Sequence, residues 1–119
     1  MKIAIPVLEK TMETAVSPSF GRAPFFLFFD TVDSMPMFME NEAAMSPGGA
    51  GIKAAEIIAK NGATVVITPS CGQNADDVLK GANIAIYRST EDSLMKTIES
   101  FKNDELKLLD EIHPGHHGK

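Results

Sequence analysis

Residues 49–67, GAGIKAAEIIAKNGATVVI, contain a helix pattern followed directly by a strand pattern. The Asn61-Gly62 pair supplies a stop for a helix over residues 50–60, and residues 63–67 are a short apolar run typical of a buried strand. This order predicts an α/β fold, in which the strand joins a sheet and the helix packs on it. The apolar residues at helical spacing are Ile52, Ala55, Ile58 and Ala59.

Three further strand patterns precede this unit. Residues 2–7 are typical of a short buried strand, which Pro6 ends or distorts because proline cannot donate to a strand ladder. Residues 24–30 are apolar on both faces, which predicts a strand covered on both sides. Residues 35–40 alternate weakly, and Pro36 places that strand at a sheet edge.

The helix–strand order then repeats towards the C-terminus. Residues 74–80 predict a short helix with Asn74 as its cap and Asp77 in its first turn, where negative charge is favourable. Residues 83–87 predict the last strand. A final helix is indicated by a capping signature, Ser89 and Asp92, and by an apolar face, Leu94, Ile98 and Phe101.

The predicted order is therefore β-β-β-α-β-α-β-α. Short connections make the first three strands antiparallel neighbours, and right-handed crossovers make the later two parallel to the first or to each other. The fold class is α/β, a five-stranded mixed sheet with helices packed on it. We expect one domain over residues 1–102. Residues 103–119 are expected to be a polar, flexible tail, except for a short extension around residues 106–109.

Composition excludes several classes of protein. The chain has 119 residues, a formal net charge of −5 and one cysteine. Its lysines and arginines are scattered, so we expect no nucleic-acid partner. A single cysteine cannot form an internal disulfide. No apolar run has the length of a signal peptide or a membrane span, so we expect a cytoplasmic protein without a membrane partner.

The predicted topology brings three small-residue loops to one end of the sheet. The segments SPSFGRA, SPGGAG and PSCGQNA follow or precede strands at that end, where ligands of α/β sheets bind. We expect them to form a binding cleft. The candidate residues are Ser19, Phe20, Gly21, Arg22, Gly48, Gly49, Ala50, Gly51, Ser70, Cys71, Gly72, Gln73 and Asn74.

Cys71 has two interpretations. It is either a small buried apolar residue or a thiolate stabilised by the following helix N-terminus, able to ligate a soft metal. The sequence favours the second, because Ser70 and Gly72 flank the thiol. Covalent catalysis would need a nearby base, and no histidine precedes His113. We therefore expect no enzyme activity.

The glycine run at residues 46–51 is either a flexible helix entry or a backbone site for an anion. It lacks the GxxxxGK[ST] pattern of nucleotide-binding loops. Arg22 either pairs with a loop carboxylate such as Glu13 or offers a cation to an anionic ligand.

The chain ends in a histidine-rich segment, whose members are His113, His116 and His117. Such a segment is either an unstructured end or an auxiliary, weak metal site. It does not have the ligand count of a defined zinc site.

Four stretches of the chain resemble one known family. MKIAIPV, VSPSFGRAPFFLFFD, GAGIKAAEIIAKNGATVVI and GQNADDVLKGANIAIY are similar, in this order, to the dinitrogenase iron–molybdenum cofactor biosynthesis family of NifX and the C-terminal domain of NifB. The resemblance implies a ribonuclease-H-like fold. Many members carry Ser-x-His-Phe-Gly-Arg where this chain has Ser-Pro-Ser-Phe-Gly-Arg at residues 17–22, so a histidine ligand of that loop is absent.

The resemblance implies a function for the cleft. Members bind and carry iron–sulfur or iron–molybdenum clusters, and a single-domain relative, the orange protein of sulfate reducers, holds a molybdenum–copper sulfide cluster. The implied cofactor is a metal–sulfur cluster containing Mo with Fe or Cu, and the implied partner is a cluster-assembly or cluster-accepting protein. We expect a monomer or weak dimer. The alternative is a regulatory or interaction protein without a cluster, in which Cys71 is packed or senses redox state.

Overall fold

A computed structural model describes residues 1–109 of the protein and confirms the predicted α/β fold. A five-stranded mixed sheet carries three α-helices and one short 3-10 helix. In chain order the elements are β1 (Lys2–Val7), β2 (Phe25–Asp30), β3 (Pro36–Glu40), η1 (Glu42–Met45), α1 (Ala50–Lys60), β4 (Val65–Thr68), α2 (Gln73–Gly81), β5 (Ala85–Arg88) and α3 (Leu94–Lys102).

The strand order is β3-β2-β1-β4-β5. The first three strands pair antiparallel, whereas β1–β4 and β4–β5 pair parallel, as the connections predict. The apolar β2 lies inside the sheet between β1 and β3, and β3 is an edge strand, as Pro36 indicates. The name ribonuclease-H-like stays a prediction.

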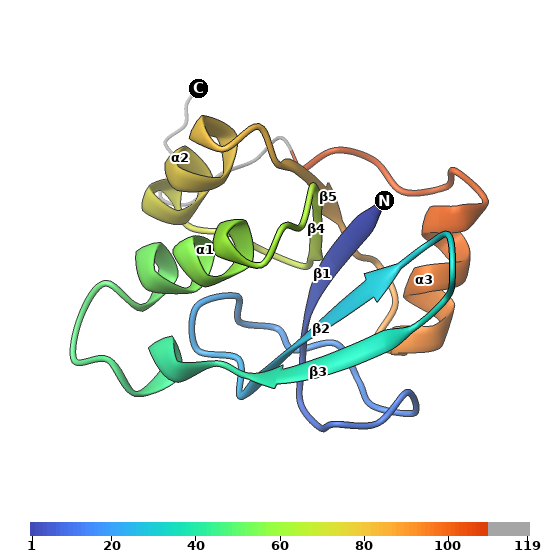
Figure 1. Ribbon diagram of the computed structural model, residues 1–119, viewed down its shortest axis with the longest axis horizontal. Coiled ribbons are helices and arrows are strands. Elements are labelled where there is room, and N and C mark those ends of the chain that lie inside the picture. The colour runs from blue at the N-terminus through green and yellow to red at the C-terminus, as the bar shows by residue number, and fades with distance from the viewer. Residues whose placement is uncertain (110–119) are drawn as a thin grey trace.

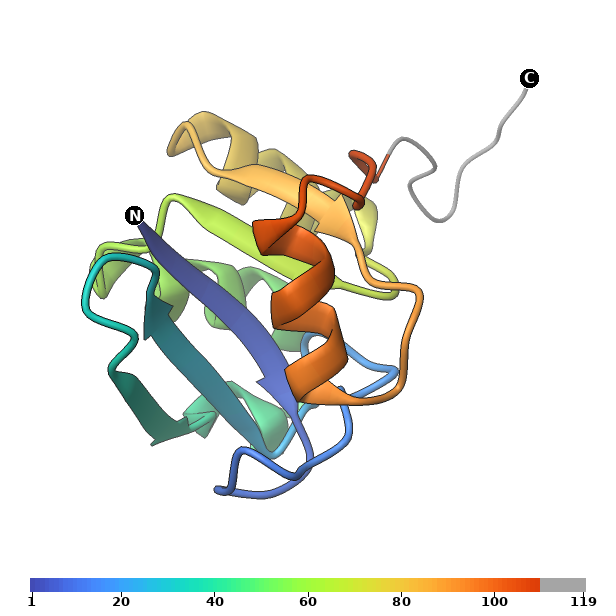
Figure 2. The same cartoon turned by 90° about the vertical axis from the view of Figure 1, so that its right-hand side faces the viewer.

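The sheet separates two apolar layers. Helices α1 and α2 cover one face and α3 covers the other (Figures 1 and 2). The first layer includes Phe26, Ile58 and Leu79, and the second includes Ile5, Leu27 and Ile98. The side chains of β2 alternate between the two layers, which explains why this strand is apolar on both faces.

Two predicted helix starts are wrong by a few residues. Helix α2 begins at Gln73 with Gly72 as its N-cap, so Asn74 lies inside the helix and Asp76 is the first-turn acid. The cap of α3 is Ser93, whose hydroxyl accepts a hydrogen bond from the Lys96 N–H. In both cases another residue of the same segment, Gly72 or Ser93, has the extended backbone that an N-cap requires.

Along α1 the buried stripe also differs slightly from the prediction. Ile52 and Ala59 are only partly buried, whereas Ala50 and Ala54 are buried with Ala55 and Ile58.

Backbone contacts continue past residue 102, in the region where a short extension around residues 106–109 was expected. The Arg88 N–H donates to the Lys107 carbonyl, and the Leu109 N–H donates to the Ile86 carbonyl. Leu109 is 3% exposed and belongs to the layer under α1 and α2. Residues 107–109 therefore cover the outer edge of β5. The expectation of a flexible tail is tested only up to this point, because residues 110–119 lie outside the described range.

None of the helices within residues 1–109 has the length and apolar character needed to cross a membrane.

Candidate functional site

Three segments meet in a cleft at the carboxyl end of β4, as the topology predicts. The cleft has a volume of about 870 Å³ and is lined by residues 18–22, 49–52 and 70–75. The lining includes every expected cleft residue except Gly48, which lies outside it. It also includes three residues that were not expected: Pro18, Ile52 and Ala75.

The cleft segments approach one another through small residues. A Cβ atom at Gly21 would lie 2.8 Å from the backbone nitrogen of Gly51, so only glycine allows this contact between two backbones. A Cβ atom at Gly51 would lie 3.4 Å from the Cβ of Ala75 on α2. The loop before β2 thus meets α1 backbone to backbone, and α1 meets α2 through Gly51 and the side chain of Ala75.

Asn41, which was not predicted, holds the same loop from the other side. Its side chain is buried, and Nδ2 donates to the carbonyls of Gly21 and Ala23 at 3.0 and 2.9 Å. Its Oδ1 accepts from the Ala43 N–H and caps η1. An asparagine directly before the helical residues 42–45 was the available sequence signal.

Helices α1 and α2 both point their N-termini at the cleft and both lack a side-chain cap. Their N-cap residues are Gly49 and Gly72, neither of which can supply a side-chain acceptor. The backbone N–H groups of the first helical turn have no acceptor within the helix. By contrast, Asn41 caps η1 and Ser93 caps α3 with a side-chain oxygen.

The two cleft helices differ in charge. The first turn of α1 contains no acidic residue, whereas α2 contains Asp76, which is 3% exposed. Asp76 Oδ1 receives no hydrogen bond and lies 3.3 Å from Lys80 Nζ. The positive end of the α1 dipole is therefore not balanced by an acidic side chain of α1. The positive end of the α2 dipole is partly balanced by the carboxylate of Asp76.

Arg22 lies at the rim of the cleft and is held by backbone oxygens. Its Nη1 donates to the carbonyls of Ala44 and Ser46 at 2.8 and 3.1 Å. One of the two expectations for Arg22 was an ion pair with a loop carboxylate such as Glu13, and the structure shows hydrogen bonds to backbone carbonyls instead. Within residues 1–109, Nε and Nη2 have no hydrogen-bond partner, so these donors remain available at the cleft.

A second polar contact crosses the rim. Ser70 Oγ donates to the carbonyl of Pro18 at 3.1 Å, and Thr68 Oγ1 donates to the carbonyl of Ser70 at 2.9 Å. The segment 17–22 is thereby linked to the end of β4 as well as to η1.

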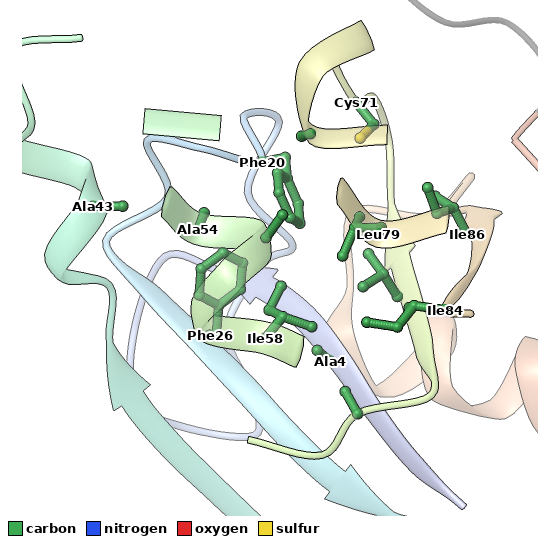
Figure 3. Packing of buried hydrophobic residues seen from close by; sticks show 14 of the residues in the cluster. Ala4, Phe20, Phe26, Ala43, Ala54, Ile58, Cys71, Leu79, Ile84 and Ile86 are labelled. Atoms are coloured by element: carbon green, nitrogen blue, oxygen red, sulfur yellow. The ribbon is translucent and has the colours of Figure 1, made fainter. Parts of the chain in front are cut away.

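Cys71 lines the cleft but is packed into the apolar layer. It is 2% exposed and belongs to the same cluster as Phe20, Leu79 and Ile86 (Figure 3). Its Sγ donates to the carbonyl of Gly72 at 3.6 Å. Burial, together with the negative charge of Asp76, raises the pKa of the thiol to about 12.

The expectation that the helix dipole keeps Cys71 as a thiolate is therefore wrong. The desolvation of the thiol outweighs the dipole of α2, which Asp76 already compensates in part. The packed interpretation of this residue agrees with the structure, and its role as a metal ligand stays a prediction.

The described part of the chain contains no classical metal centre. Within residues 1–109, no group of three or more His, Cys, Asp or Glu side chains is arranged to hold a metal ion. The auxiliary ligands expected in the tail, His113, His116 and His117, lie outside the described residues.

Comparison with known proteins assigns the chain to a family. The model of the family described as dinitrogenase iron–molybdenum cofactor matches residues 1–104. The chain belongs to the dinitrogenase iron–molybdenum cofactor family. No match to the chain is found among curated protein sequences.

Solved structures of similar proteins share this fold. The apo form of the orange protein from Desulfovibrio gigas is 27% identical, with a TM-score of 0.87 over 92% of both chains. A Thermotoga protein described as NifB-type is 29% identical, with a TM-score of 0.83 over 96% of this chain and 98% of its own. A Methanocaldococcus jannaschii protein, whose description as a dinitrogenase is provisional, is 20% identical, with a TM-score of 0.71 over 92% of this chain and 95% of its own, and shares the fold.

Proposed function

We propose that this member of the dinitrogenase iron–molybdenum cofactor family binds a preassembled, anionic metal–sulfur cluster in the cleft and passes it to another protein. The cluster is of the iron–molybdenum or molybdenum–copper sulfide type that the sequence resemblance implies. It is cargo, so the chain needs no catalytic residues. The expected partner is a cluster-assembly or cluster-accepting protein.

The single observation that carries this proposal is the pair of uncapped helix N-termini. Free N–H groups and the positive end of a helix dipole favour an anion, and buried N–H groups in proteins normally have acceptors. Helices η1 and α3 obtain these acceptors from Asn41 and Ser93. Helices α1 and α2 begin with glycines at the cleft, where an external anion can supply the acceptors.

Arg22 adds a fixed cation to the same region. Because its Nη1 is anchored on the carbonyls of Ala44 and Ser46, the guanidinium loses little further conformational freedom when a ligand binds. The remaining donors suit sulfide or oxygen atoms on the outside of an anionic cluster.

The residues fit a preassembled cluster better than a bare metal ion. A volume of about 870 Å³ is at the upper end for a small-molecule site, for which about 300–1,000 Å³ is typical. The absence of a three-ligand group within residues 1–109 opposes the direct capture of a single ion. A cluster whose metals already hold sulfides needs few protein ligands.

Cys71 has to be deprotonated before it can ligate a metal of the cluster. With a pKa of about 12, deprotonation at pH 7 costs about 7 kcal/mol, since one pKa unit corresponds to about 1.4 kcal/mol. We therefore propose that N–H groups and Arg22 provide the first contacts, and that Cys71 ligates only if the metal bond exceeds this cost.

The test is a titration of the apo-protein with tetrathiomolybdate, a soluble sulfide-bearing anion, followed by its visible absorbance. We expect Arg22→Ala to weaken binding at least about tenfold, since hydrogen bonds to charged groups contribute about 1.5–3 kcal/mol. Arg22→Lys should restore part of the affinity. Lys96→Ala, which removes one exposed charge from α3, is the matched control and should leave the affinity unchanged.

Metal analysis of freshly purified protein for Mo, Cu and Fe completes the test. Equal affinity of the wild type and Arg22→Ala would contradict a cleft site. Protein that carries no metal and binds no thiomolybdate would instead favour the regulatory or interaction protein, in which Cys71 only packs.

A further inference from the structure

We propose that the free edge of β3 is a docking site for a basic, extended segment of a partner protein. The two edges of the sheet differ. The outer edge of β5 is covered by residues 107–109, which pair with Ile86 and Arg88. Within residues 1–109, β3 has β2 as its only strand neighbour. This proposal is independent of what the cleft binds.

The register identifies the backbone groups that β3 presents outwards. The Asn41 N–H donates to the Pro24 carbonyl, and these two residues are opposite when the β2–β3 register is continued. Hydrogen-bonded pairs alternate along an antiparallel ladder. Met37 and Met39 therefore bond to β2, whereas the N–H and C=O groups of Phe38 and Glu40 point away from the sheet.

Apolar side chains border this edge. Val32, Met35 and Met37 are 85%, 64% and 45% exposed; Met37 lies in β3, Met35 directly before it, and Val32 in the turn between β2 and β3. Methionine side chains are flexible and polarisable, so they adapt to different apolar partners. A strand added to the edge would bury part of this surface as well as the outward backbone groups.

The negative charge around β3 favours a basic partner segment over a second copy of this chain. From residue 23 to residue 52 the chain has four acidic residues and no lysine or arginine. Natural edge strands are often protected by lysine, and none is present in β3. Asp33 and Glu40 border the edge at its two ends and are exposed. A basic segment complements this edge, whereas a second copy of the chain would bring like charges together.

The test uses a seven-residue peptide of alternating lysine and valine with the ¹⁵N-labelled full-length protein at low salt. We expect the peptide to shift the amide resonances of Phe38 and Glu40 and to slow their hydrogen exchange. The double variant Asp33→Lys/Glu40→Lys should weaken binding at least about tenfold. The matched control, Glu91→Lys/Asp92→Lys, makes the same charge change on an exposed loop and should bind as the wild type does.

Three results would overturn the proposal. The first is peptide binding that is equal in both double variants, or that leaves the amides of Phe38 and Glu40 unchanged. The second is protection of these amides that rises with protein concentration without peptide, which would assign the edge to a second copy. The third is protection that disappears when residues 110–119 are deleted, which would assign it to the C-terminal segment of the same chain.

Discussion

Helices α1 and α2 begin differently from helix α3. Ser93 caps α3 with its hydroxyl, a contact that commonly stabilises a helix by about 1 kcal/mol. Gly49 and Gly72 provide no such contact for α1 and α2. The cleft therefore lies at two helix starts that lack the stabilisation of a side-chain cap. Its segments are held instead by the close backbone approach at Gly21 and by the hydrogen bonds of Asn41.

The largest effect should come from breaking that backbone approach. Gly21→Val places a side chain 2.8 Å from the Gly51 nitrogen, so the loop and α1 must separate. We expect a loss of unfolding free energy of about 3 kcal/mol and loss of thiomolybdate binding. Urea denaturation and the absorbance titration measure the two effects.

The control for Gly21→Val is Gly81→Ala at the end of α2, where nothing lies within 4 Å of the new Cβ. This variant should retain both stability and binding. A Gly21→Val protein with normal stability would show that the two backbones are not held in contact.

Cys71 gives a pH-dependent effect at the start of α2. The native thiol keeps its proton up to a pKa of about 12, against an ordinary value of 9.0. Between these values the native state binds more protons than the unfolded state, so stability falls as the pH rises, by at most about 1.4 kcal/mol per pH unit. Below about pH 9 this contribution is fully present.

The measurement is urea denaturation of the wild type and Cys71→Ala at about pH 8 and about pH 10.5. The wild type should lose more stability than the variant, and iodoacetamide should modify Cys71 slowly in the native protein at neutral pH. Fast alkylation, or equal pH dependence of the two proteins, would restore the interpretation of an exposed thiolate.

Alanine substitutions at the neighbouring Gly48 and Gly49 should differ in their effect on stability and anion binding, by less than the changes above. Gly49 has a φ of 70°, a left-handed backbone that costs an alanine about 1–2 kcal/mol. Gly48 has no positive φ, and a Cβ there meets nothing within 4 Å. We expect Gly49→Ala to lower the melting temperature and weaken anion binding, whereas Gly48→Ala should change neither.

The smallest effect is at the capped helix. Ser93→Ala should lower the unfolding free energy by about 1 kcal/mol without changing the affinity for thiomolybdate, because Ser93 does not line the cleft. A change in affinity as large as that of Gly49→Ala would remove the distinction between the two kinds of helix start.

Hydrophobic patterns sufficed to predict a five-stranded mixed sheet with antiparallel first strands and parallel later strands, because connection length and crossover handedness decide strand direction. The places of β4 and β5 next to β1 came only from the structure, because two right-handed crossovers allow more than one order. The meeting of residues 18–22, 49–52 and 70–75 followed from that topology. The burial and protonation of the Cys71 thiol could not be predicted in this way, since the flanking Ser70 and Gly72 gave no indication of how deeply the thiol is buried. A short extension around residues 106–109 was expected, but its place on the outer edge of β5 was not, because a three-residue segment has too little periodicity to show which strand it joins.

The parallel pairing of β1 with β4 also affects when the cleft can form. This pairing joins Ile3 to Val65, and closing such a long loop slows folding. The last cleft segment, residues 70–75, follows β4 directly. A nascent chain therefore has no cleft until more than half of it has been synthesised and β1 has paired with β4, so a ligand of the cleft cannot bind before residues 70–75 have been made.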